Sequence, residues 1–184
     1  NLDNNCETLD SINVSDLRSN PTVALSNPGP LDCRTLNVKI NATTKSPNEK
    51  ISWSTKNGNI VGGTSSHSII VDKGGKFYIE VEDTIGHCII TDSISVIEDF
   101  NTPVAQINAD TIFNCKDVQK TIDASGSSNY DNLKFIWSGN GMIDAGHGTN
   151  KIIVSSAGTY KLTIIDTTNG CMDTKQITIN PDLN

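Results

Sequence analysis

The sequence GTYKLTIID at residues 158–166 decides the fold of this chain. Apolar or aromatic residues alternate with polar ones along it, which is typical of a β-strand with one face in a core. The same pattern occurs 83 residues earlier, as GKFYIEVED at residues 75–83. The chain therefore contains an internal repeat, which has to be identified before a fold is inferred.

Other landmarks recur 82 to 84 residues apart and in the same order. They are Cys6, Cys88 and Cys171; Pro21 and Pro103; Cys33 and Cys115; Ile40 and Ile122; Ala42 and Ala124; and Trp53 and Trp137. We expect residues 1–20 to be the last strand of a preceding repeat, with complete repeats at 21–100 and 101–184. Only Ile97 to Pro103 join the two complete repeats, without a Gly/Ser-rich linker, which favours a semi-rigid string of domains.

Each repeat consists of short segments with a period of two, and no helical periodicity reaches three turns. Strands are predicted at Thr22 to Ser26, Leu36 to Ala42, Ile51 to Ser54, Ser68 to Val71, Lys76 to Glu82, Ile89 to Val96, Val104 to Asn108, Val118 to Ala124, Leu133 to Trp137, Lys151 to Val154, Thr159 to Ile165 and Lys175 to Ile179. Turn signals such as Asn57-Gly58 and Asn140-Gly141 separate them. The pattern predicts an all-β chain of tandem immunoglobulin-like β-sandwich repeats.

The aromatic residues of each repeat are predicted to be core residues. We expect Trp53 to pack with Phe77 and Trp137 with Tyr160, because the strand alternation points these side chains inward. A platform on which a carbohydrate stacks is the alternative interpretation of the same residues.

The amino-acid composition limits which partners and which cellular locations are expected. The chain has 14 Lys and Arg against 21 Asp and Glu, for a formal net charge of -7. The basic residues are scattered singly, which argues against nucleic acid as a partner. No apolar stretch of membrane-spanning length occurs, so we do not expect the chain to span a membrane. Five cysteines in register indicate a disulfide framework and an oxidising, extracellular compartment.

The cysteines allow two pairings. The first closes each repeat on itself, as Cys33 to Cys88 and Cys115 to Cys171, and we favour it because each complete repeat has one cysteine of each kind. Ordinary immunoglobulin topology places those two cysteines at opposite ends of a domain. That topology would instead bring Cys33 near Cys171 and staple neighbouring repeats together. Cys6 is expected to pair outside this sequence.

Motifs for catalysis are absent from the sequence. His67, His87 and His147 all lie in predicted turns, and no nucleophile elbow, P-loop or zinc-protease spacing occurs. We expect no enzyme activity and no cofactor. Asp123 and Asp131, with Ser125 and Ser127 between them, are a weak calcium candidate. An Asx turn capped by its own backbone is the simpler interpretation.

Two stretches resemble a known family. GTYKLTIIDTTNGC at residues 158–171 and IDASGSS at residues 122–128, followed by Trp137, are similar to polycystic-kidney-disease-type and related immunoglobulin-like repeats of Bacteroidota surface adhesins, such as gliding-motility adhesins. The typical Trp-Asp-Phe-Gly-Asp-Gly motif is replaced by Trp53-Ser54-Thr55-Lys56-Asn57-Gly58 in the first repeat. The resemblance implies a long secreted filament at the cell surface. It also implies O-glycosylation at Asp-Ser/Thr-apolar triplets, which would modify Ser11, Thr84, Ser93 and Thr111.

The predicted function is that of a structural and adhesive repeat segment of a large extracellular cell-surface protein. Its expected partners are neighbouring repeats of the same chain and a polysaccharide or other surface ligand. One alternative is a carbohydrate- or partner-binding module that uses the loop Gly139 to Asn150. Another is an accessory repeat of a secreted hydrolase.

Overall fold

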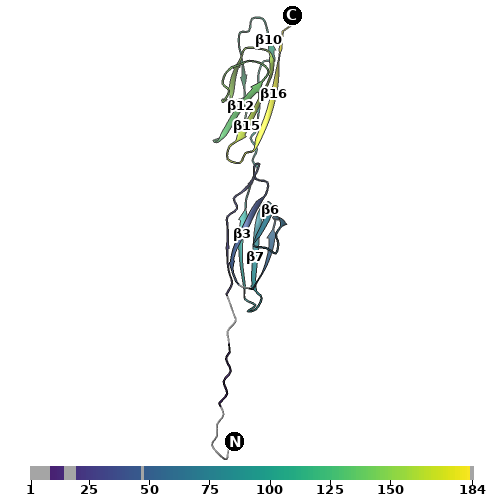
Figure 1. Ribbon diagram of the computed structural model, residues 1–184. Helices are drawn as coiled ribbons and strands as arrows, with labels where there is room; N and C mark the ends of the chain where they lie inside the picture. The colour runs from purple at the N-terminus through teal and green to yellow at the C-terminus, as the bar shows by residue number, and fades with distance from the viewer. Residues whose placement is uncertain (1–8, 15–19, 47, 183–184) are drawn as a thin grey trace, which may run out of the picture.

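The computed structural model of the chain describes residues 9–14, 20–46 and 48–182. Across these residues the chain is all-β and forms two sandwiches arranged end to end, so the molecule is elongated (Figure 1). We call the sandwich of β1 to β9 unit one and the sandwich of β10 to β16 unit two. No helix in the described part of the chain has the length and apolar character needed to cross a membrane.

Unit one has the strand order of an immunoglobulin domain. Its strands are β1 Thr22–Leu25, β2 Leu31–Asp32, β3 Val38–Lys45, β4 Glu49–Lys56, β5 Asn59–Gly62, β6 Ser68–Lys73, β7 Gly75–Asp83, β8 Ile89–Val96 and β9 Glu98–Asp99. One sheet runs β1-β3-β6-β5 and the other β4-β7-β8, while β2 pairs in parallel with β9. Four strands against three in this order is the immunoglobulin arrangement.

Unit two has the same order for the strands that it shares with unit one, but its described residues contain no counterpart of β1. Its strands are β10 Ile112–Phe113, β11 Lys120–Asp123, β12 Leu133–Gly139, β13 Ile143–Ala145, β14 Lys151–Val154, β15 Gly158–Asp166 and β16 Met172–Pro181. The sheets run β11-β14-β13 and β10-β16-β15-β12. β10 pairs in parallel with β16, as β2 does with β9. The predicted all-β, immunoglobulin-like fold is therefore confirmed.

Each unit has its own core, built from the inward-facing residues of both sheets. The four predicted core aromatics are buried: Trp53, Phe77, Trp137 and Tyr160. Both indole N–H groups donate to a backbone carbonyl at 2.9 Å, that of Ser66 in unit one and that of Thr149 in unit two. The Tyr160 hydroxyl donates to the Ser156 carbonyl at 2.6 Å. Every polar atom that these rings carry inward is thus satisfied, as burial requires.

One predicted strand is absent. Val104 to Asn108 forms only a single bridge, between Asn108 and Asp123. Side-chain oxygens take the backbone N–H groups that a neighbouring strand would have bound. Val104 N donates to Ser128 Oγ at 2.9 Å, and Ala105 N donates to Asp173 Oδ2 at 2.8 Å. Apart from the bridge at Asn108, the segment is part of no sheet.

Residues 9–14 of the segment predicted to end a preceding repeat contain no strand, and their apolar side chains Leu9, Ile12 and Val14 are almost fully exposed. A strand that completes a neighbouring sandwich has nothing to pair with here. The remainder of that segment, with Cys6, lies outside the described residues, so its assignment stays a prediction.

Candidate functional site: the joint between the units

A disulfide closes the joint between the two units. Cys33 bonds Cys171, with a Cα–Cα distance of 5.0 Å and a sequence separation of 138. Cys88 and Cys115 are free thiols. The favoured pairing of Cys33 with Cys88 and of Cys115 with Cys171 is therefore wrong in this structure, and the alternative is the one observed.

The reason is the topology. Cys33 follows β2, and the partner of β2, strand β9, leads into unit two. Cys88 precedes β8, at the end of unit one that is remote from unit two. A strand of eight residues spans about 26 Å. Bonded cysteines need Cα atoms within about 7 Å of each other. The two cysteines of one unit consequently lie too far apart to bond.

On the side of unit one, Cys33 sits in an Asx turn. Asp32 Oδ1 accepts the backbone N–H groups of Arg34 at 2.9 Å and Thr35 at 2.7 Å. Burial by itself would raise the pKa of Asp32, but these N–H groups and the Arg34 guanidinium lower it below its usual value. The charged carboxylate therefore holds the turn that presents the cysteine.

On the side of unit two, Cys171 ends the loop between β15 and β16. Asp166 N donates to Cys171 O at 2.9 Å, and Thr168 N donates to Asp166 Oδ1 at 2.8 Å. The Thr168 N–H is the main cause of the lowered pKa of Asp166. Gly170 adopts a φ of 75°, a left-handed conformation that glycine reaches without strain.

Polar contacts flank the disulfide. Asn169 is 2% exposed, and its Nδ2 donates to Asp99 Oδ1 and to Asn101 O, both at 3.0 Å. Its Oδ1 accepts the Cys171 backbone N–H at 2.9 Å. The guanidinium of Arg34 in turn donates to the Thr168 carbonyl. The joint is thus attached by a disulfide and by a buried amide that links the two units.

The close fit also explains the Gly170 position. A Cβ built there would lie 2.4 Å from Arg34 Cγ. Sequence reasoning had not identified Asn169, Asp99 or Arg34 as joint residues. The available signal was Asn169-Gly170-Cys171, because the first repeat has Gly86-His87-Cys88 at the same place.

Of the calcium candidates, Asp123 ends β11 and Asp131 lies in the turn before β12. Asp123 pairs with Lys151 at 2.8 Å, and its Oδ1 accepts Ser125 N at 2.8 Å, so the Asx turn is formed. The Lys151 ammonium, followed by the Ser125 hydroxyl and N–H, lowers the pKa of Asp123 to about 2. Among the described residues, no three His, Cys, Asp or Glu side chains gather as a metal site. Asp123 already has a cation beside it.

The segment Gly139 to Asn150, which is predicted to bind a ligand, forms hydrogen bonds with the sandwich of unit two. Within Gly139 to Asn150, Thr149 O accepts the Trp137 indole, and Thr149 Oγ1 donates to Lys151 O at 2.6 Å. Its C-terminal end is therefore held by the sandwich, and its middle, Ile143–Ala145, is strand β13. A ligand for this loop remains a prediction.

The predicted glycosylation residues lie on the surface or near it. Ser11, Thr84 and Thr111 are exposed, and Ser93, in β8, is half-buried. Thr84 Oγ1 donates to Asn48 O at 3.0 Å. Their modification remains a prediction.

No family model matches this chain, and no curated protein matches it. Among solved structures it is similar to a C-terminal fragment of intimin, crystallised with the intimin-binding domain of its receptor, at 10% identity and a TM-score of 0.47. This similarity covers 88% of the chain and 64% of the fragment. It is also similar to murine CEACAM1b, at 13% identity and a TM-score of 0.38 over 88% of the chain and 100% of that protein. The fold assignment rests on the strand order of the two units, which is immunoglobulin-like in both.

Proposed function

We propose that this chain is a structural and adhesive segment of a larger extracellular cell-surface protein, in which immunoglobulin-like units are held in line by fixed joints. The observation that carries the proposal is the Cys33–Cys171 bond between units, because it restrains their orientation rather than the interior of either one. A disulfide at this place also requires an oxidising compartment, which supports an extracellular location. The finer setting, a filament of the gliding-adhesin kind, rests on the sequence resemblance.

Stiffness at the joints would be essential to the function of such a segment. A freely jointed string of domains coils, whereas units fixed at their joints hold a distal tip away from a surface. Weak surface contacts on successive units would add through multivalency, which provides adhesion without a deep binding site.

Small-angle scattering of the purified chain tests the proposal. We expect an elongated two-domain particle. The maximum dimension should vary little among the conformations present in solution. Cys33→Ser combined with Cys171→Ser should broaden that distribution, because the peptide linker and Asn169 alone then hold the joint. Cys88→Ser combined with Cys115→Ser is the matched control and should leave the scattering unchanged. A compact particle, or equal flexibility in all three proteins, would contradict the proposal.

Adhesion requires a separate test. Binding of the chain to a panel of polysaccharides and surfaces, with and without calcium, distinguishes an adhesive segment from a spacer. Saturable binding lost when Gly139 to Asn150 is altered would favour the ligand-binding alternative.

A further inference from the structure

The two free thiols occupy the same positions in their units as the two bonded cysteines. Cys115 corresponds to Cys33, and Cys88 corresponds to Cys171. Cys115 lies at the end of unit two that is remote from the joint, and Cys88 lies at the remote end of unit one. Each end of the described chain therefore carries one half of a joint like the one in its middle.

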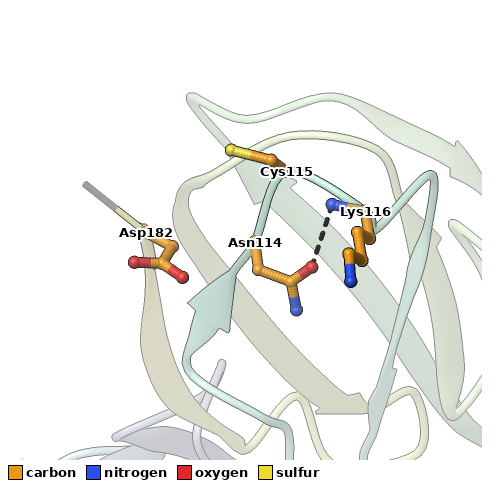
Figure 2. Close-up of a pocket in the computed structure, with 4 residues that line it drawn as sticks. All are labelled: Asn114, Cys115, Lys116 and Asp182. Carbon is orange, nitrogen blue, oxygen red and sulfur yellow. Dashed lines mark hydrogen bonds between the residues drawn. The ribbon is translucent and has the colours of Figure 1, made fainter. Parts of the chain in front are cut away.

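The turn at Cys115 is built like the turn at Cys33. Asn114 Oδ1 accepts the Lys116 N–H at 3.0 Å, as Asp32 Oδ1 accepts the Arg34 N–H in unit one. Asp117 N donates to Asn114 O at 3.0 Å and closes the turn. Figure 2 shows Cys115, which is exposed, in this turn between Asn114 and Lys116, with its sulfur pointing away from the Lys116 side chain.

The loop at Cys88 is built like the loop at Cys171. Asp83 N donates to Cys88 O at 2.9 Å, and His87 N donates to Asp83 O at 2.8 Å. Unit two has the same two bonds from Asp166 N and Gly170 N, at 2.9 and 2.8 Å. His87 takes a φ of 54°, the left-handed conformation that Gly170 also has, although such a φ is unfavourable for a residue with a side chain. The loop therefore already has the shape that presents a cysteine to a neighbouring unit.

The surface beside Cys115 is hollowed. Asn114, Cys115, Lys116 and Asp182 line the hollow (Figure 2). Asp182 is in the position of Asp99, which accepts the Asn169 amide in the existing joint, and Lys116 is in the position of Arg34, which donates to the Thr168 carbonyl. The hollow thus has a carboxylate and a cation at the positions of Asp99 and Arg34 in the existing joint.

From this equivalence we infer that Cys115 and Cys88 are halves of further inter-unit disulfides. Cys115 bonds the second cysteine of a following unit of this kind, and Cys88 bonds the first cysteine of a preceding one. The occupant of the hollow beside Cys115 is the loop of such a unit, with an Asp five residues before its cysteine. This inference deepens the proposed function and rests on it, since it makes every joint of the segment covalent.

Bond formation is a two-electron oxidation. Each thiol loses its proton, the two sulfurs bond, and the electron pair reduces a disulfide-type oxidant, such as an oxidoreductase disulfide or oxidised glutathione, to two thiols. Thiol–disulfide exchange with such an oxidant needs an accessible sulfur, and Cys115 is exposed while Cys88 is half-buried.

A tandem duplicate tests the inference. Asn184 of the full chain is followed directly by residues 20–184 of a second copy, in a Cys6→Ser background. This junction places the second Cys88 138 residues after the first Cys115, which is the separation of Cys33 and Cys171. The protein is produced in an oxidising compartment, alkylated without reduction, digested and analysed by mass spectrometry.

We expect a peptide in which the first Cys115 is joined to the second Cys88, together with a Cys33–Cys171 bond in each copy. The alkylated forms of the junction cysteines should be lost. The matched control, Cys88→Ser in the second copy only, should restore alkylation of the first Cys115 and leave both Cys33–Cys171 bonds.

Alkylation of both junction cysteines alongside intact Cys33–Cys171 bonds would overturn this inference. The proposed function, a segment of units held in line, would be unaffected. Loss of the Cys33–Cys171 bonds as well would overturn both. The Cys33–Cys171 bond in each copy thus serves as the internal measure of correct folding.

Discussion

Units one and two agree closely in their cores and differ at the loop before their second cysteine. Each has a buried Trp whose indole donates to a loop carbonyl at 2.9 Å, and the strands that the units share pair in the same order. In that loop, however, unit two has Asn169 and Gly170 where unit one has Gly86 and His87. The core therefore specifies the fold of every unit, while a few loop residues specify how one unit docks on the next.

The largest effects should come from the shared core. Trp53→Ala and Trp137→Ala each remove a buried aromatic side chain, at a cost of about 3–5 kcal/mol. For a unit with so thin a core this is a large share of the total stability. We expect each variant to lower the melting transition of its own unit and to leave the other near its wild-type temperature, as measured by calorimetry. Two equally shifted transitions would mean that the units fold as one body.

Glycines beside the core rings should show a smaller effect of the same kind. A Cβ at Gly141 would lie 2.1 Å from the Tyr160 hydroxyl, and one at Gly58 would lie 2.5 Å from Cζ of Phe77. Gly141→Ala should destabilise unit two by about 1–3 kcal/mol through overpacking. Gly148→Ala is the matched control, because nothing lies within 4 Å of its Cβ. Equal melting temperatures for the two variants would show that the ring is not packed as described.

The loop difference predicts an effect confined to the joint. Asn169→Gly gives unit two the residue that unit one has, and it removes the two hydrogen bonds that Asn169 Nδ2 donates to Asp99 Oδ1 and to the Asn101 carbonyl. We expect a loss of about 1–3 kcal/mol in docking free energy, because the joint loses two hydrogen bonds of about 0.5–1.5 kcal/mol each. Faster amide hydrogen exchange at Cys171 and Asn101, with little change in either core, would be the signature. Gln176→Ala, on an exposed strand position, serves as the control, and unchanged exchange in the Asn169 variant would contradict the joint.

The smallest effect concerns the contribution of Asp123 to folding stability at low pH. Lys151 holds the pKa of Asp123 at about 2, below the usual value of about 3.9. A carboxylate with a lowered pKa stabilises the folded state above about pH 4, and this contribution is lost as the pH falls through about 2. Asp123→Asn should therefore lower the melting temperature slightly at pH 7 and much less once the pH is below about 2. Asp131→Asn is the control, and a difference that persisted at low pH would contradict the ion pair.

The sequence predicted the features that repeat and missed those that do not. Alternation predicted β14 within its observed bounds, Lys151–Val154, and predicted the buried aromatics, because a half-buried strand leaves a pattern in its own residues. Short edge strands such as β2 and β9 leave no such pattern. Val104 to Asn108 has the alternation, but hydroxyl and carboxylate acceptors replaced its strand partner.

The joint was harder to predict because its parts lie far apart in the sequence. Counting cysteines per repeat favoured bonds within a unit, and only the positions of Cys33 and Cys88 at opposite ends of one sandwich exclude that pairing. The role of Asn169 depends on contacts with Asp99 and Asn101, which lie 70 and 68 residues away in the sequence.

Peptide mapping of the unreduced chain, produced in an oxidising compartment and alkylated before digestion, tests the central claim most directly. The account predicts a peptide in which Cys33 is joined to Cys171, with Cys88 and Cys115 alkylated. Peptides that join Cys33 to Cys88 and Cys115 to Cys171 would contradict it, because each unit would then be closed on itself and the joint would have no covalent tie.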